Sequence, residues 1–85
     1  MTFVARVYVT PKAAVLDPAG KAVASSLKSL GYGEVDDVRL GKYVEVRLRA
    51  DGRGAAETRV REMCRRLLAN EVIEDFRFDV EADGR

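Results

Sequence analysis

Histidine and tryptophan are absent from the 85-residue sequence, and cysteine occurs once, at Cys64. The absence of histidine removes the side chain that proteins use most often as a general base and as a metal ligand. It also excludes Ser–His and Cys–His nucleophile pairs. One cysteine cannot form an internal disulfide, and a structural zinc site needs more Cys or His than this sequence holds. The composition therefore indicates a domain that does little chemistry itself.

Long apolar runs are also missing. The sequence has no stretch of about 18 apolar residues, so we expect no transmembrane helix and no membrane partner. The N-terminus lacks the basic start and apolar stretch of a signal peptide, and a single unpaired cysteine is typical of a reducing compartment, which predicts a cytoplasmic protein. We expect residues 1–85 to form one domain with a thin core, and small domains of this kind are commonly stabilised by self-association.

The net charge of +1 is unevenly distributed. Residues 71–85 carry six acidic and two basic side chains, a net charge of −4, which is typical of a solvated strand and terminus. The balanced total argues against general binding to nucleic-acid phosphates. The stretch "RLGKYVEVRL" (39–48) weakly resembles the aromatic-basic strand of RNA-recognition sheets, which stack bases on two or three aromatics. Tyr43 is the one aromatic in it, so we expect no nucleic-acid partner.

Period-two alternation predicts three extended segments, at 3–10, 32–49 and 72–81. In the middle segment the apolar parity runs through Gly41, which favours one long central strand that is bent or bulged there. A hairpin at Gly41-Lys42 is the alternative, although it would mix the two faces across the turn. The apolar faces of the outer two segments consist of Phe3, Ala5, Val7 and Val9, and of Phe76, Phe78 and Val80.

Two helices are predicted between these strands. In "VLDPAGKAV" (15–23), Asp17 is a good N-cap and Pro18 suits the first helical position, and the helix should run about 13 residues, to a left-handed Gly31. The second helix should span 55–69, with Asn70 in a left-handed end position. Its apolar stripe consists of Ala56, Val60, Met63, Cys64 and Leu67, which makes Cys64 an inert core thiol.

The predicted order is β-α-β-α-β, an α+β two-layer sandwich with both helices on one face of a mainly antiparallel sheet. The other face would carry Val4, Tyr8 and Tyr43 among charged side chains, and in a dimer a partner would cover it.

Motifs for catalysis or for binding a cofactor or a metal are not found. "DGRG" (51–54) lacks the Lys-Ser/Thr of a phosphate-binding loop. A cation held by Asp17 with the carboxylates of 34–37 is disfavoured, because neighbouring side chains of a strand face opposite ways. Glu74 and Asp75 are more typical of a contact surface. From the residues alone, a docking protein and a small-ligand-binding regulatory domain both remain open.

Three stretches together resemble a known family: "KAAVLDPAGKAV" (12–23), "SLGYGEVDDVRLGKYVEV" (29–46) and "EMCRRLLANEVIEDFRFDVE" (62–81). In this order and spacing, over essentially the whole chain, they resemble the PurS family, the small subunit of phosphoribosylformylglycinamidine (FGAM) synthase. The sequence departs from the family pattern at Ala14, where the family usually has Gly, and at Glu71, where it usually has Pro. Both positions lie in loops.

The resemblance implies a non-catalytic subunit of an ATP- and glutamine-dependent ligase of de novo purine biosynthesis, which converts FGAR into FGAM. It implies two partners, a glutaminase subunit and a large synthetase subunit, with self-association to a dimer or tetramer and help in transferring ammonia. ATP and magnesium would be used by the assembled complex, with no cofactor in this chain. The residues that we expect to contact partners are Val15, Leu16, Asp17, Pro18, Lys21, Lys42, Tyr43, Asn70, Glu74 and Asp75.

Overall fold

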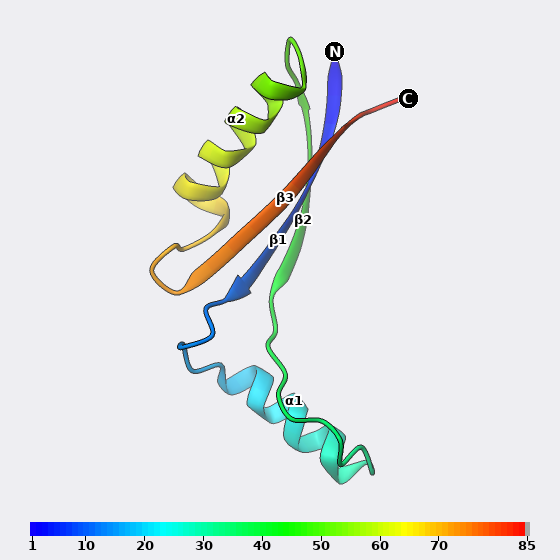
Figure 1. Cartoon of the computed structure of the whole chain (residues 1–85), viewed down its shortest axis with the longest axis vertical. Coiled ribbons are helices and arrows are strands. Elements are labelled where there is room, and N and C mark those ends of the chain that lie inside the picture. The colour runs from blue at the N-terminus through cyan, green and yellow to red at the C-terminus, as the bar shows by residue number, and fades with distance from the viewer. Residues whose placement is uncertain (85) are drawn as a thin grey trace.

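The computed structural model describes residues 1–84. Along the chain lie β1 (Thr2–Pro11), α1 (Pro18–Ser29), β2 (Lys42–Arg49), α2 (Arg53–Met63), η1 (Cys64–Leu68) and β3 (Glu74–Ala82) (Figure 1). The short η1 is a π-helical turn that continues α2. The predicted α+β class and the β-α-β-α-β order are confirmed.

The three strands form one antiparallel sheet in the order β2-β1-β3, so the first strand of the chain is the central one. Val7 of β1 lies opposite Val44 of β2 and Phe78 of β3. Because side chains alternate between the faces of a strand, this register places the apolar sides of all three strands on the same face of the sheet.

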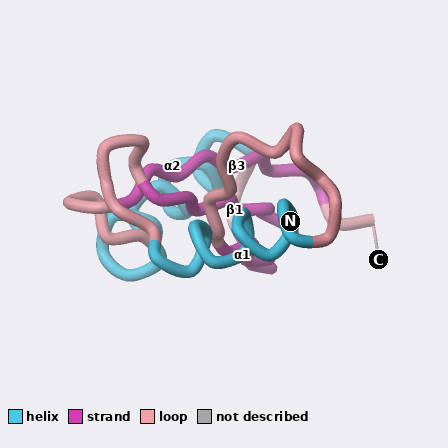
Figure 2. Tube along the Cα trace, turned by 90° about the horizontal axis from the view of Figure 1, so that it is seen from below, coloured by secondary structure: helices cyan, strands magenta, loops and turns pink. Residues whose placement is uncertain are grey.

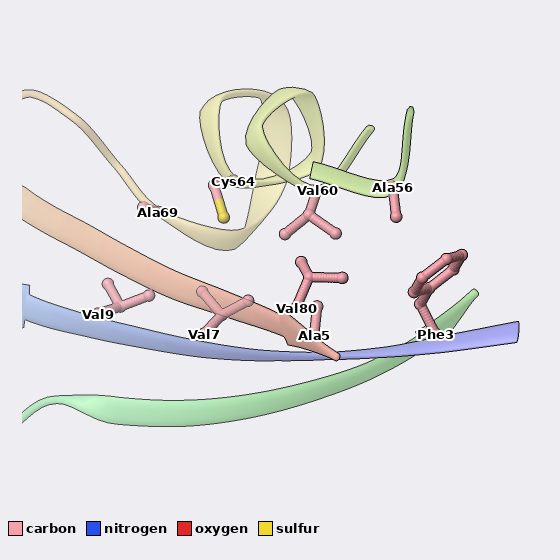
Figure 3. Packing of buried hydrophobic residues seen from close by; sticks show 9 residues of the cluster. All are labelled: Phe3, Ala5, Val7, Val9, Ala56, Val60, Cys64, Ala69 and Val80. Atoms are coloured by element: carbon pink, nitrogen blue, oxygen red, sulfur yellow. The ribbon is translucent and has the colours of Figure 1, made fainter. Parts of the chain in front are cut away.

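The helix α2 covers part of that apolar face and packs on β1 and β3 (Figure 1). The side chains between helix and sheet point toward one another and form the core (Figure 3). Full burial of one valine contributes about 1.5–3 kcal/mol, so a core this small leaves a modest margin of stability. The core consists of Phe3, Ala5, Val7, Val9, Ala56, Val60, Cys64, Ala69 and Val80.

The long central strand that was predicted over 32–49 is wrong in its first half, and so is the alternative hairpin at Gly41. The strand begins at Lys42, and it pairs with β1 as an edge strand. Residues 36–41 are irregular, because groups of this segment bond Asp17 before α1 and the Pro11 carbonyl at the end of β1 and do not continue the ladder of the sheet. The Leu40 N–H, for example, donates to Asp17 Oδ2 at 2.9 Å.

The placement of α1 also differs from the prediction of two helices on one face of the sheet. The helix projects beyond the end of the sheet (Figure 1), and a view from that end shows it in front of the strands (Figure 2). Gly20 is its one buried residue. The molecule measures 50 × 29 × 14 Å, and its two-layer part is restricted to the sheet and α2.

The C-terminal end of the second helix departs from the regular α-helix that was predicted. At η1 the N–H of Ala69 donates to the carbonyl of Cys64, five residues back, at 2.9 Å. This wider turn shifts the stripe by one residue, because a π turn inserts one residue into the helical repeat. Leu68 therefore packs against the core, whereas Leu67, predicted to be in the stripe, is 82% exposed. Asn70 does not adopt the predicted left-handed conformation, since no described residue other than a glycine has a positive φ.

Candidate partner-interaction site

The predicted contact residues come from three segments that meet at one end of the sheet. Because the strands are antiparallel, the end of β1 lies beside the starts of β2 and β3. Val9 lies opposite Lys42, Thr10 opposite Asp75, and Pro11 opposite Glu74. We call residues 12–21, 38–43 and 70–75 the loop end of the sheet.

Asp17 joins two of these segments. Its Oδ1 accepts the N–H of Gly20 at 3.0 Å, as the predicted N-cap should, and its Oδ2 accepts the N–H of Leu40 at 2.9 Å. These hydrogen bonds, from Gly20 and then from Leu40, hold the pKa of the Asp17 carboxyl below its ordinary value. Pro18 occupies the first helical position as predicted. The start of α1 is therefore fixed to the segment that leads into β2.

Two glycines that the sequence reading did not assign to the site make this packing possible. A Cβ at Gly20 would overlap the carbonyl oxygen of Val38, and a Cβ at Gly41 would overlap the carbonyl oxygen of Val9. Both positions are thus places where two backbones approach closely. A glycine in the first turn of a capped helix is unfavourable by itself, which was the signal that could have identified Gly20.

The C-terminal end of α1 is capped as predicted. Gly31 has φ of 103°, its N–H donates to the Lys28 carbonyl at 3.0 Å, and the N–H of Tyr32 donates to the Leu27 carbonyl at 3.0 Å. This pair of bonds is a Schellman motif, which satisfies the last carbonyls of the helix. The helix therefore begins and ends at defined residues even though it lies apart from the sheet.

Asn70 organises the turn before β3. Its backbone N–H donates to Glu74 Oε1 at 2.8 Å, and its side-chain Oδ1 accepts the N–H of Val72 at 3.2 Å. The Asn70 carbonyl also accepts the N–H of Glu74 at 2.7 Å. Asn70 and Glu74 are thus bound to each other, which gives both predicted residues a role in shaping the turn.

Lys12 connects this turn to β1, and sequence reasoning missed it. Its Nζ lies 2.8 Å from Asp75 Oδ1, and its backbone N–H donates to the Ile73 carbonyl at 2.9 Å. Arg39 makes a similar link by donating to the Pro11 carbonyl at 3.0 Å. The signal for Lys12 was its place directly after a strand whose neighbour begins with two carboxylates.

The loop end exposes apolar side chains beside these polar links. Leu16 is 67% exposed and Val72 is 82% exposed, Lys21 and Lys42 are exposed as well, and Val15 is half-buried. Exposed apolar side chains such as Leu16, with a lysine such as Lys21 nearby in the chain, are compatible with a surface that contacts another protein.

Tyr43 is separate from this surface, because it lies on the open face of the sheet. Its ring centroid is 5.2 Å from that of Tyr8, and its hydroxyl donates to Glu45 Oε2 at 2.7 Å, which raises its pKa. Arg77 lies over the Tyr8 ring at 4.1 Å, and Arg6 is ion-paired with Glu81. As predicted, this face is a mixture of aromatic and charged groups.

The described residues offer little for catalysis. Cys64 is buried, and burial raises the pKa of its thiol, which is the opposite of what a nucleophile needs. Across residues 1–84 no group of three or more His, Cys, Asp or Glu side chains is placed to hold a metal ion. Over the same residues, no helix has the length and apolar character needed to cross a membrane.

Comparison with known proteins identifies the family. The model of the PurS family, described as phosphoribosylformylglycinamidine (FGAM) synthase, matches residues 4–82. The chain belongs to the PurS family. It is 51% identical over 76 residues to the phosphoribosylformylglycinamidine synthase subunit PurS of Bacillus subtilis, which covers 89% of each chain. To the PurS subunit of Synechocystis it is 49% identical over 77 residues, covering 91% of this chain and 77% of that protein.

Solved PurS structures have the same fold. A structure of Bacillus subtilis PurS matches with a TM-score of 0.83 and 49% identity, over 93% of this chain and 98% of that one. A chain in a structure of PurLQS from Thermotoga maritima matches with a TM-score of 0.87 and 26% identity, over 95% and 99% of the two chains. The resemblance seen in the sequence is therefore confirmed, and this chain is a PurS subunit of FGAM synthase, an enzyme of purine biosynthesis.

Proposed function

We propose that this PurS chain is a non-catalytic bridging subunit of FGAM synthase. It holds the glutaminase subunit against the large synthetase subunit and assists the transfer of ammonia between them. The complex would then convert FGAR, glutamine and ATP into FGAM. ATP and magnesium belong in this proposal to the synthetase partner, and the chain itself supplies no catalytic group, cofactor site or metal site.

The construction of the loop end is the observation that carries this proposal. Asp17 fixes the path of the loop before α1 by two hydrogen bonds, and Asn70 and Lys12 fix the neighbouring turn. Leu16 remains exposed although the loop that carries it is held by these hydrogen bonds. A docking surface gains affinity when its side chains are already held in the bound arrangement, because less conformational entropy is lost on binding.

The comparison with solved structures also supports an assembly with a glutaminase and a synthetase subunit. The PurLQS structure from Thermotoga maritima contains a chain of this fold, which covers almost the whole length of both molecules. We infer equivalent partners for this chain, together with self-association to a dimer or tetramer. We also propose a cytoplasmic location, because the free thiol of Cys64 suits a reducing compartment.

Reconstitution tests the bridging function. The synthetase and glutaminase subunits are assayed for FGAM formation with and without this chain, using glutamine in one series and ammonium chloride in the other. We expect glutamine-dependent synthesis to require the chain and ammonia-dependent synthesis to proceed without it. Glutamine-dependent turnover that is the same with and without the chain would refute the proposal.

A pair of variants tests the loop end itself. Leu16→Asp places a carboxylate in the exposed apolar patch and should lower glutamine-dependent turnover, while ammonia-dependent turnover is unchanged. Ala55→Asp is the matched control, because Ala55 is also exposed but lies in the first turn of α2, away from the loop end. Equal activity of the two variants would show that the patch at Leu16 is not a contact surface.

A further inference from the structure

The face of the sheet that is turned away from α2 carries a groove. This open face consists of the outward side chains of β1, β2 and β3, and the register places Val4 between Arg47 and Glu81. A groove of about 440 Å³ opens around Val4. We call it the open-face groove. Its charged lining has a net charge of −1 and consists of two arginines, Arg6 and Arg47, and three carboxylates, Glu45, Glu81 and Asp83.

Two ion pairs account for four of these five charged side chains. Arg6 reaches toward β3, where its guanidinium is ion-paired with Glu81. Arg47 Nε lies 2.8 Å from Asp83 Oδ2, and the Asp83 side chain is only 9% exposed. Because each pair is neutral, the two pairs leave the groove with one uncompensated negative charge.

Glu45 carries this charge. Arg6 lies directly opposite Glu45 in the register of β1 and β2, but its guanidinium is turned to the other side, toward β3. Within residues 1–84, the exposed Glu45 carboxylate receives one hydrogen bond, from the neutral hydroxyl of Tyr43 to Oε2 at 2.7 Å. A carboxylate that is oriented in this way but has no cation beside it favours a positively charged group of a partner.

The composition of the open face is that of a protein contact surface. The outward positions of β1, β2 and β3, all of which the structure describes, hold two tyrosines and four arginines but no lysine. Tyrosine and arginine are enriched where protein interfaces bind most strongly, whereas lysine is depleted there. The arginines are Arg6, Arg47, Arg49 and Arg77.

The aromatic side chains of this face are held in place within the chain itself. The ring centroids of Tyr8 and Tyr43 are 5.2 Å apart, and the Arg77 guanidinium lies 4.1 Å from the centroid of Tyr8. A cation–π contact of this kind keeps the arginine in one arrangement. A partner that binds here therefore loses little side-chain entropy.

The groove and the loop end lie at opposite ends of the sheet. Val4 precedes Pro11, the last residue of β1, by seven positions, which is about 23 Å along an extended strand. Both termini of the chain lie at the groove end, away from α1 (Figure 1). Two proteins can therefore bind the chain at once, one at each end, as a bridging subunit requires.

We propose that the open face is the contact surface for the second of the two partner subunits, and that its groove receives a basic side chain of that subunit beside Glu45. The loop end contacts the first subunit. An arginine or lysine that enters the groove neutralises Glu45 and brings the net charge of the groove to zero. The inference rests on the proposed bridging function and names the surface and the chemistry of one of its two contacts.

Photo-cross-linking in the assembled three-subunit complex tests which protein covers each end. A photo-reactive phenylalanine analogue replaces either Arg49, which is exposed at the groove end of the open face, or Leu16 at the loop end. We expect position 49 to cross-link to one partner subunit and position 16 to the other, as identified by mass spectrometry. Cross-links from both positions to the same subunit, or from position 49 to a second copy of this chain or to nothing, would overturn the proposal.

Removal of the Glu45 charge tests the groove itself. Glu45→Gln keeps the shape of the side chain and can still accept the Tyr43 hydrogen bond, so the circular dichroism should be unchanged. When the chain is titrated into the other two subunits, we expect Glu45→Gln to raise the Kd about 10-fold or more, and Glu45→Lys to raise it further. The Kd of the wild type should also increase more steeply with salt than that of Glu45→Gln, because salt screens the ion pair.

Glu57→Gln is the matched control for this substitution. Glu57 lies on α2, on the other side of the sheet, and makes no ion pair within residues 1–84. Its Kd and salt dependence should equal those of the wild type. A Glu45→Gln variant that binds as tightly as Glu57→Gln, with the same salt dependence, would overturn the pairing at Glu45.

These experiments separate the failure of the open-face contact from the failure of the bridging function. The bridging function is read from the requirement for the wild-type chain in glutamine-dependent synthesis. If that requirement holds while Glu45→Gln binds normally, the open-face contact alone is refuted. If the wild-type chain is not required, the bridging function is refuted, whatever protein position 49 contacts.

Discussion

Replacing Gly20 with alanine tests whether the start of α1 depends on a close backbone approach to Val38. Inside a helix alanine is favoured over glycine by about 1 kcal/mol, so such a change normally stabilises a protein. Here the new Cβ would overlap the Val38 carbonyl oxygen and lie 2.6 Å from Asp17 Oδ2. Relieving a clash with backbone by moving packed groups costs about 1–3 kcal/mol. Gly20→Ala should therefore cancel the usual gain or reverse it.

Gly54→Ala is the matched control for this prediction. Gly54 also lies in the first turn of a helix, α2, and a Cβ there would meet nothing within 4 Å. The gain in helix propensity is similar in both variants, so their difference in unfolding free energy isolates the clash, at about 1–3 kcal/mol.

Thermal unfolding followed by circular dichroism measures this difference. For a domain of this size 1 kcal/mol shifts the Tm by about 4–8 °C, so Gly20→Ala should unfold at least about 4 °C below Gly54→Ala. Both variants must be compared at one protein concentration, because the Tm of a protein that self-associates depends on its concentration. Two variants of equal stability would refute the close approach between α1 and the segment before β2.

Three other predictions concern the core and two titrating groups. Val60→Ala, which removes a fully buried side chain, should lower the unfolding free energy in urea by about 2 kcal/mol, and an unchanged midpoint would contradict the packing of α2 on the sheet. The raised pKa of the buried Cys64 means that the unfolded chain loses its thiol proton first, so stability should fall as pH rises above about 9, and Cys64→Ala should abolish that fall. The lowered pKa of Asp17 has the opposite sign: its contribution is present above its ordinary pKa of 3.8 and is lost as pH falls through the lower folded value. Helical circular dichroism should show this acid loss in the wild type, and an equal loss in Asp17→Asn would contradict the role of the carboxylate as a cap.

The strands were predictable wherever one apolar side meets the core. Alternation located β1 and β3 to within two residues, because a one-residue slip would reverse their buried faces. The same alternation gave a wrong prediction at 32–41, where Val38 and Leu40 share the parity of β2 but contact the start of α1 through their backbone atoms. Parity cannot tell a strand from an irregular segment whose backbone is bound by a side chain such as Asp17.

The helices were predictable in extent but not in what they contact. The caps at Asp17 and Gly31 are local features, and both are confirmed. The apolar stripe of α1 predicted a buried side, yet Val23 and Leu30 of that stripe are 36% and 74% exposed, because the helix lies beyond the end of the sheet. The π turn that exposes Leu67 had no signal in a pattern that assumes a regular helix.

At the candidate site, the sequence identified Asp17 and the turn at Asn70 but not their connections. The links from Lys12 to Asp75 and from Arg39 to Pro11 join residues far apart in the chain. They depend on the antiparallel register of three strands, which a single sequence does not specify. The role of each predicted residue in binding partners stays a prediction.

The central position of β1 has a consequence for how the molecule is made. This strand is synthesised first, but its hydrogen-bonding neighbours are residues 42–49 and 74–82. The sheet is therefore incomplete until almost all of residues 2–82 have been translated, and pairings this distant are slow to form. Until β2 is translated both edges of β1 are unpaired, and one edge stays unpaired until β3 is translated, so the sheet is completed only after the synthesis of its last strand.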